Sequence, residues 1–115
     1  MNKITVNCEQ KNREKELQYE KDIAKRVAKW PRGYSYLADQ IKRAMISSVL
    51  NLCEGNGKTI SSTERRRFFQ ISMGSIAEVS AGLDLAKTFH LINPNDQDRL
   101  KSYLKAAYVK IKALP

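Results

Sequence analysis

Two carboxylates stand in stretches of the chain that carry almost no other charge, and a pair of this kind could act as a general acid and a general base. Glu54 follows the stretch 44–53, and Glu78 lies within the stretch 68–83. Both stretches have helical patterns. Two helices that fold back on each other near residue 58 would hold the carboxylates more than roughly 20 Å apart. Each glutamate is therefore expected to make its own local contacts instead of joining a catalytic pair.

These local contacts are predicted to form a structural polar network that fixes the register of the two helices. Glu54 is expected within reach of Arg65 or Arg66, and Glu78 is expected near Gln40, Lys42 or Arg43. Buried ion pairs of this kind specify geometry more reliably than they add stability. The predicted network comprises Gln40, Arg43, Asn51, Glu54, Ser75 and Glu78.

The densest basic group is Arg65-Arg66-Arg67, at the start of a predicted helix. Successive helical residues are about 100° apart, so the three side chains cannot all face one ligand. Positive charge at a helix N-terminus is mildly unfavourable, which favours a compensating anion. A second basic face is predicted near the end of the chain, where Tyr103 and Tyr108 accompany Lys101, Lys105 and Lys112. The alternative there is a solvated face with the tyrosines packed at its rim.

The loop Gly55-Asn56-Gly57-Lys58-Thr59 contains part of the pattern of a phosphate-binding loop. It lacks the first glycine of that motif at the required distance, and it follows a predicted helix where the motif needs a strand. It is therefore interpreted as a helix–helix connection in which Lys58 could contact a phosphate as a point charge. The predicted nucleic-acid-binding residues are Lys58, Arg65, Arg66, Arg67, Lys101, Lys105 and Lys112.

The pattern of nucleophiles and bases argues against an enzyme. His90 is the only histidine, which excludes a histidine-rich metal site and a relay of several imidazoles. It is expected at the end of a helix, close to the last carbonyl groups. No spacing supports Cys53 and His90 as a nucleophile pair, because a cysteine in an apolar helix is commonly just buried. We expect no catalytic residue, no metal and no cofactor.

The composition is typical of one small basic domain. The 115 residues allow a single core, with a polar leader over residues 1–9 and one domain over residues 10–115. The net charge is +9 and is spread along the chain: residues 1–60 contain 12 basic and 7 acidic side chains, and residues 61–115 contain 9 and 5. Such a balance favours polyanions as partners, and the alternative is a basic protein without such a ligand.

The cellular compartment is predicted from the cysteines and the apolar runs. Cys8 and Cys53 are not expected to form a disulfide framework, which favours a reduced intracellular chain. The first residues contain no apolar run that could serve as a signal peptide. No stretch is long and apolar enough to span a membrane. We therefore expect a cytoplasmic protein.

Apolar periodicity predicts four helices and no strand. The first covers about 10–29 and is stopped by Pro31 and Gly33; the second starts near Ser35 as N-cap and ends at Gly55. The third follows Ser61, expected as the N-cap of a capping box with Glu64, and continues to about residue 90. The fourth opens at Pro94. Short connections between four helices predict an all-α, antiparallel up-down-up-down bundle.

The two charge-free stretches also bear on assembly. A helix without a charged face is covered on all sides, and one small core cannot cover two such helices. Another copy of the chain is the natural cover, so a homo-oligomer is expected.

Three motifs together resemble one protein family. They are the run Leu37-Ala38-Asp39-Gln40-Ile41-Lys42-Arg43-Ala44, the segment from Asn51 to Gly57, and Gly74-Ser75-Ile76-Ala77-Glu78. They fit the pattern L-x-x-Q-I-x-R-A … N-x-x-E-G-x-G … G-S-x-x-E over residues 31 to about 91. This pattern is similar to that of the small four-helix-bundle proteins encoded in intervening sequences of 23S ribosomal RNA genes. Their relatives include the accessory variability protein of diversity-generating retroelements.

The resemblance implies a homopentameric, ring-like assembly with basic surfaces and no catalytic activity. For the retroelement branch it implies binding of nucleic acid and of a reverse transcriptase. Together with the charge, it leads us to predict a non-catalytic, cytoplasmic protein that binds RNA or DNA through phosphate contacts. The alternative is a protein-interaction scaffold in which the charge serves solubility.

Overall fold

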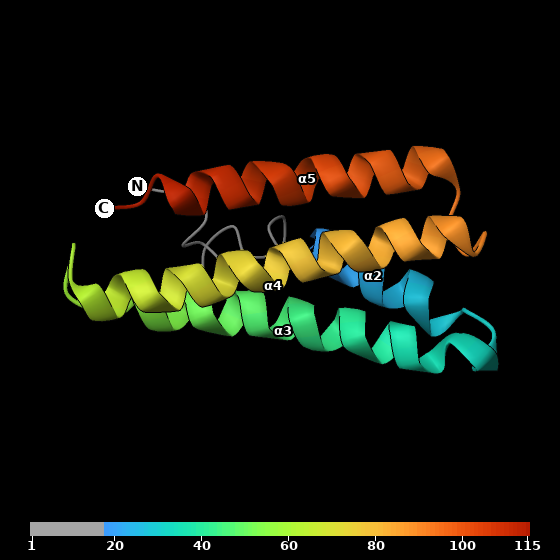
Figure 1. Ribbon diagram of the computed structural model, residues 1–115, viewed down its shortest axis with the longest axis horizontal. Coiled ribbons are helices and arrows are strands. Elements are labelled where there is room, and N and C mark those ends of the chain that lie inside the picture. The colour runs from blue at the N-terminus through green and yellow to red at the C-terminus, as the bar shows by residue number, and fades with distance from the viewer. Residues whose placement is uncertain (1–17) are drawn as a thin grey trace.

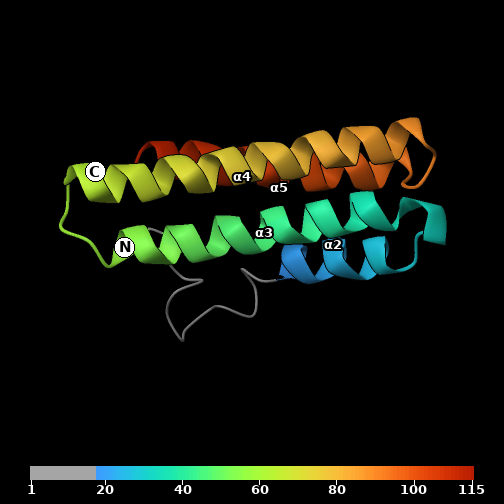
Figure 2. The same ribbon diagram turned by 60° about the horizontal axis from the view of Figure 1, so that its bottom comes forward.

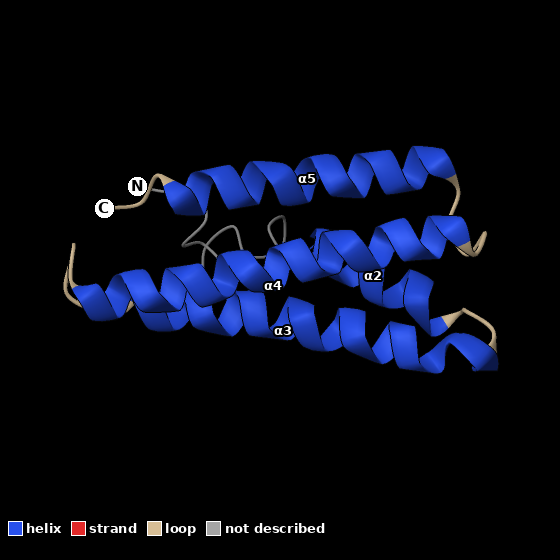
Figure 3. Cartoon of the chain, in the orientation of Figure 1, coloured by secondary structure: helices blue, strands red, loops and turns tan. Residues whose placement is uncertain are grey.

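The computed structural model describes residues 18–115 and is helical throughout that part of the chain, with no strand (Figure 3). The predicted leader over 1–9 and the first part of the predicted first helix lie outside the described residues. The prediction of four helices and of an all-helical chain is confirmed for the described part. The elements are α2 Gln18–Ala28, the short 3-10 helix η2 Arg32–Tyr34, α3 Ser35–Asn56, α4 Thr63–Thr88 and α5 Pro94–Lys112.

The helices lie side by side along one long axis. The chain reverses in the loop between α3 and α4 and again between α4 and α5, as the colour sequence of Figure 1 shows. α3 and α4 make the most extensive contact, α5 packs along α4, and α2 packs on α3. The view in Figure 2 separates the pair α4 and α5 from the pair α2 and α3. At each of these two reversals, helices that follow each other in the sequence therefore lie in direct contact.

Apolar residues at helical spacing form one core between these helices. The largest fully buried side chains come from three helices: Ile41 from α3, Val79 and Leu83 from α4, and Leu100 from α5. Ile23 and Val27 contribute the buried face of α2. The described part of the chain thus folds around a single core, as the length of the chain allows.

Small residues let α3 and α4 approach closely. Ser72 Oγ donates to the Ser48 carbonyl oxygen at 2.7 Å, and Ser75 Oγ donates to Ser47 Oγ at 2.8 Å. Two glycines lie on the same seam. A Cβ at Gly55 would be 2.6 Å from the Phe69 ring, and a Cβ at Gly82 would be 2.6 Å from Ile41 Cγ1.

Replacing either seam glycine by alanine should therefore destabilise the protein. Helix propensity alone would favour alanine by about 1 kcal/mol, but overpacking a close contact costs about 1–3 kcal/mol. We expect Gly55→Ala and Gly82→Ala to lower the free energy of unfolding by about 1–2 kcal/mol in urea denaturation. Gly33→Ala is the control, because nothing lies within 4 Å of a Cβ there. A stabilising Gly82→Ala would contradict the seam geometry.

Three predicted helix boundaries are wrong by one or two residues. Ser35 is the first residue of α3 rather than its N-cap, which is Tyr34. Gly55 lies inside α3, where its missing side chain makes room for Phe69, and Gly57 is the C-cap. The N-cap of α4 is Ser62, whose side chain accepts from the Arg65 amide. The predicted position of Pro94 in the first turn of α5 is confirmed.

His90 closes the C-terminal end of α4 in a left-handed conformation, with φ of 60°. Its amide donates to the Lys87 carbonyl at 3.0 Å, and the Leu91 amide donates to the Ala86 carbonyl at 2.8 Å. These two bonds form a Schellman motif, in which glycine is the preferred residue at the left-handed position. The only histidine thus ends a helix, as predicted, but through its backbone.

His90→Gly should therefore stabilise the protein. The left-handed region costs a residue with a Cβ roughly 1 kcal/mol relative to glycine, so we expect the free energy of unfolding to rise by about 0.5–1 kcal/mol. Urea denaturation measures this change. Lys87→Gly, one turn earlier in ordinary helical geometry, should lower the same quantity by about 0.5–1 kcal/mol. Equal effects of the two substitutions would refute the backbone role of His90.

Candidate nucleic-acid interface

One stripe of α5 carries three of the predicted phosphate-binding lysines. Lys101, Lys105 and Lys112 are separated by four and seven residues, spacings that return to the same face of a helix. Tyr108 lies between Lys105 and Lys112 on that face and is partly exposed. The structure therefore brings these three lysines and one of the two predicted tyrosines together.

Lys101, Lys105 and Tyr108 of this stripe line one wall of an open groove of about 650 Å³ between α4 and α5. The α4 wall includes the small side chains of Ala77 and Ser80 and the charged Asp84 and Lys87. Lys101 Nζ donates to Asp84 Oδ1 at 2.7 Å, and the same oxygen accepts from Gln97 Nε2 at 2.7 Å. One acid of the groove is therefore already neutralised.

The other two lysines of the α5 stripe face solvent without acidic partners. Lys105 and Lys112 are exposed, and within the described residues neither makes an ion pair. Asp98 is the second acid of the groove, and Lys87 is a further cation in its lining. Helical spacing also places Arg66 on the face of α4 that includes Asp84, eighteen residues later. A positive stripe with an aromatic side chain therefore lies along this groove.

The arginine triplet is divided among three directions. Arg65 was predicted at the basic surface but is buried, with 7 % of its surface exposed. Its Nε donates to the main-chain oxygen of Pro115 at 2.8 Å, and Nη1 donates to the Gly55 carbonyl at 3.2 Å. Its guanidinium lies 4.7 Å from the centre of the Phe69 ring. Arg65 is therefore a structural residue here, because its helical position shares the face of Phe69.

The other two arginines of the triplet are exposed. Arg66 points to the groove face of α4, as described above. Arg67 falls on a different stripe, four residues before Ile71 and eleven before Glu78. The two exposed arginines therefore serve different surfaces.

Lys58 is near acids on both sides of the α3–α4 loop. Its Nζ is 3.7 Å from a Glu54 carboxylate oxygen and 3.9 Å from one of Glu64. It also lies 5.7 Å from the centre of the Phe68 ring. Its charge is thus partly balanced. Glu54 pairs with Lys58 rather than with the predicted Arg65 or Arg66.

The predicted polar network is realised only around the α3–α4 seam. Asn51 Nδ2 donates to the Ser47 carbonyl at 2.8 Å and lies 3.1 Å from Ser47 Oγ, which also accepts from Ser75. Glu54 and Glu78 are exposed in the single chain, so their predicted burial does not come from the core of one copy. Arg43 and Glu78 lie at the same level of the seam. No hydrogen bond or ion pair within the described part involves Gln40, Arg43 or Glu78.

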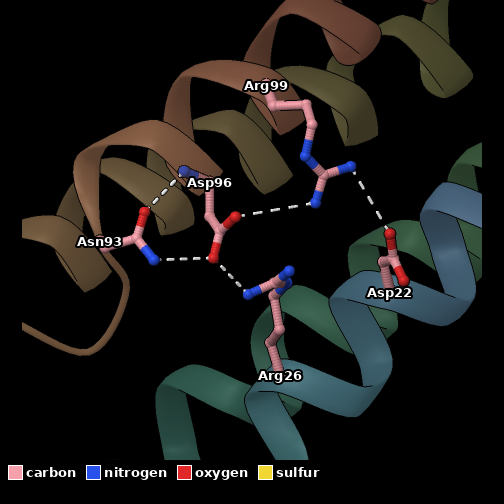
Figure 4. A network of polar contacts seen from close by, with 5 residues as sticks. All are labelled: Asp22, Arg26, Asn93, Asp96 and Arg99. Carbon is pink, nitrogen blue, oxygen red and sulfur yellow. Dashed lines mark hydrogen bonds and ion pairs between the residues drawn. The ribbon is translucent and has the colours of Figure 1, made fainter.

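Sequence reasoning missed a second polar network, which ties α2 to the start of α5 (Figure 4). Arg26 Nη1 donates to Asp96 Oδ2, and that oxygen also accepts from Asn93 Nδ2 at 2.8 Å. Asn93 Oδ1 accepts from the Asp96 amide at 2.8 Å and caps α5. Arg99 bridges Asp96 and Asp22 at 3.8 and 3.6 Å.

The cysteines differ from the prediction. Cys53 is disulfide-bonded, and Cys8 lies outside the described residues.

The family model described as "23S rRNA-intervening sequence protein" matches residues 9–113. The chain belongs to this family. The family predicted from the three motifs is thus confirmed, and the match extends over all the described helices. No curated protein matches the chain.

In this member of the 23S rRNA-intervening sequence family, several large apolar side chains remain exposed. On α3, Ile46 and Leu50 are 59 % and 62 % exposed. On α4, Ile71 and Leu85 are exposed by nearly half, as is the C-cap residue Phe89. The α4 residues share one stripe with Gly74 and Glu78, which is the charge-poor helix noted in the sequence.

The described helices of this family member were compared with the requirements of a membrane span and of a metal site. None of them combines the length and apolar character that are needed to cross a bilayer. Within residues 18–115, no group of three or more acidic, histidine or cysteine side chains is arranged to hold a metal ion.

Proposed function

We propose that this family member is a non-catalytic protein that binds RNA or DNA through phosphate contacts. Its four helices would form an antiparallel up-down-up-down bundle, and the bundles would assemble as a ring-like homo-oligomer, a pentamer by the family resemblance. The retroelement branch of that resemblance further suggests a role as accessory subunit of a reverse transcriptase. The primary contact surface would be the groove between α4 and α5.

The observation that carries this proposal is the exposed lysine stripe of α5. Lys105 and Lys112 have no acidic partner within the described residues, and Lys101 neutralises Asp84 beside them. Lysine is a flexible point charge that suits phosphate oxygens rather than base edges. Tyr108 adds an aromatic surface between two of the lysines, on which a base or sugar could pack. The expected binding is therefore electrostatic and largely independent of sequence.

Electrostatic binding of this kind has a measurable signature. Each neutralised phosphate releases counterions, so the logarithm of the affinity should fall linearly with the logarithm of the salt concentration. We expect this fall when labelled RNA and DNA are titrated at increasing salt. The double variant Lys105→Glu/Lys112→Glu should reduce the salt slope by about two and the low-salt affinity by at least roughly tenfold.

The matched control carries the same change of net charge on other faces. Lys110 is on α5 but nine residues from Lys101, and therefore on the opposite side of the helix. Lys21 is on α2. The variant Lys21→Glu/Lys110→Glu should change affinity only modestly. Equal losses of affinity in the two double variants would show that the α5 stripe is not the binding surface. Binding that is insensitive to salt would contradict the phosphate mechanism.

A protein-interaction scaffold is the second candidate, and an apolar groove favours it. The groove lies between α2 and α3 and is about 430 Å³ in volume. Apart from Lys21 and Lys42, its lining is apolar: Ala24, Met45, Ile46, Val49 and Leu50. Grooves of this kind accept apolar side chains of a partner helix. Co-purification of a protein partner that survives nuclease treatment, together with absent nucleic-acid binding, would favour the scaffold.

A further inference from the structure

A second cavity lies at the end of the molecule where α2, the segment after it and the α4–α5 connection meet. It has a volume of about 520 Å³, within the range of small-ligand sites. Its lining includes the indole ring of Trp30 and the basic side chains of Lys25, Arg26 and Lys29. Two further side chains come from the connection before α5, His90 and Asn93. It is separate from the groove of the proposed phosphate contacts and shares no lining residue with it.

Trp30 is the only tryptophan of the chain, and it is placed at the border of core and cavity. It is half-buried and packs against the apolar core, while the rest of its surface lines the cavity. Its indole N–H has no hydrogen-bond partner within the described residues. A half-exposed indole held by a core is a rigid platform with a free donor, and such platforms bind the faces of nucleobases.

The charges around Trp30 leave two lysines without partners. The two acids of the cavity, Asp22 and Asp96, are balanced by Arg26 and Arg99 in the network of Figure 4. Lys25 and Lys29 make no ion pair within the described part of the chain. Lys29 directly follows the last residue of α2 and is four residues from Lys25, and like charges at this spacing repel each other. An anion that binds beside Trp30 would relieve this repulsion.

We propose that this cavity binds one unpaired nucleobase of a single-stranded nucleic acid, stacked on Trp30, with its flanking phosphates on Lys25 and Lys29. The inference rests on the proposed binding of nucleic acid and names its class. A duplex keeps its bases stacked inside the helix, whereas a single strand can turn a base outward onto an aromatic side chain. The cavity would thus give preference for single strands, and the α5 stripe would supply general phosphate attraction.

The single tryptophan makes the inference directly measurable. We would titrate the full chain with a single-stranded oligonucleotide and with a duplex of equal length at matched salt. Binding would be followed by anisotropy of the labelled oligonucleotide and, separately, by tryptophan fluorescence. We expect the single strand to quench Trp30 over the concentration range in which it binds, and the duplex to bind more weakly without comparable quenching.

Substitutions assign the effect to the cavity. Stacking of one base on an aromatic ring contributes roughly 5- to 150-fold in affinity, so Trp30→Ala should lose affinity for the single strand in that range. Trp30→Phe preserves an aromatic face and the packing against the core, and should retain part of the preference. Lys25→Ala/Lys29→Ala should weaken single-strand binding several-fold more than Lys21→Ala/Lys110→Ala, which removes the same charge elsewhere.

The outcomes separate this inference from the proposed function. If neither form of nucleic acid binds, both fail. If both forms bind equally, with salt dependence but without quenching of Trp30, the α5 interface stands and the cavity inference is wrong. If a nucleoside monophosphate quenches Trp30 but the single strand does not, the cavity is a small-molecule site and the inference is again wrong.

Discussion

Arg65→Ala is expected to destabilise the protein by about 2–4 kcal/mol while leaving the nucleic-acid affinity of the folded protein unchanged. The substitution removes the bonds from the guanidinium to the Gly55 carbonyl and to the Pro115 main-chain oxygen, and hydrogen bonds from a charged donor contribute about 1.5–3 kcal/mol. The Gly55 carbonyl keeps its bond from the Lys58 amide. The substitution also removes the contact with the Phe69 ring and opens space beside it. Urea denaturation measures the first effect, and titration with labelled RNA under native conditions measures the second.

Arg66→Ala is the matched control for this prediction, because it removes the same side chain one residue later. Arg66 is exposed and has no partner within the described residues, so its loss should change stability by less than about 0.5 kcal/mol. It should instead reduce the salt slope of nucleic-acid binding by about one. If Arg65→Ala lowered affinity at full folding and left stability intact, the structural assignment of Arg65 would be wrong.

Arg65 and Arg66 are adjacent but have different roles, and a pattern in the sequence distinguishes them. The 100° spacing showed that the three arginines cannot all face one ligand, but all three were still predicted at the nucleic-acid surface. Comparison with the apolar stripe would have assigned Arg65 to the interior, because it precedes Phe69, Ser72 and Ile76 by four, seven and eleven residues, and all three are buried. A charged residue in phase with a buried stripe is expected to satisfy its donors inside the protein.

The helices themselves were predictable because local physics determines them. Proline and glycine interrupt the apolar periodicity at the right places, and the polar residues before α4 and α5 cap them. The error at the start of α4 came from two adjacent serines with equal capping chemistry. Ser62 is the one whose hydroxyl reaches the Arg65 amide, while Ser61 adopts φ of 64°. Sequence cannot choose between such neighbours without the path of the loop.

The network between α2 and α5 was not predictable from spacing. Arg26 and Asp96 are seventy positions apart, so no helical repeat connects them. Their contact follows from the packing of α2 on the start of α5, which depends on the whole core. The same holds for the cavity around Trp30, whose walls come from segments that are remote in sequence. Local sequence patterns thus predict the helices, whereas sites that form between helices can be located only when the fold is known.

Charged substitutions on the exposed apolar stripes should convert a homo-oligomer into monomers. Leu50 on α3 and Leu85 on α4 are 62 % and 49 % exposed in the single chain, and the α4 stripe includes only one acid, Glu78. Burying an unpaired carboxylate at an interface costs several kcal/mol per site. We expect the unmodified protein to have a mass several times 13.2 kDa, and Leu50→Glu/Leu85→Glu to have a mass near 13.2 kDa. Light scattering after size-exclusion chromatography measures both.

Gly74 offers a second test of the predicted contact between copies of the chain. It is exposed in the middle of α4, and nothing within 4 Å would meet a Cβ there, so the single chain gives no steric reason for a glycine. Glycine costs a helix about 1 kcal/mol relative to alanine. A close approach by another copy would account for it, and Gly74→Leu should then reduce the mass without unfolding the chain.

Ile60→Glu is the control for this set, because Ile60 is 66 % exposed but lies in the α3–α4 loop, away from both stripes. It should leave the mass of the assembly unchanged. If the unmodified protein is a monomer at micromolar concentration, the ring and the role of Gly74 both fail. If it is an oligomer that Leu50→Glu/Leu85→Glu and Gly74→Leu leave intact, the subunits meet through other surfaces, and Glu78 is not a polar contact between copies.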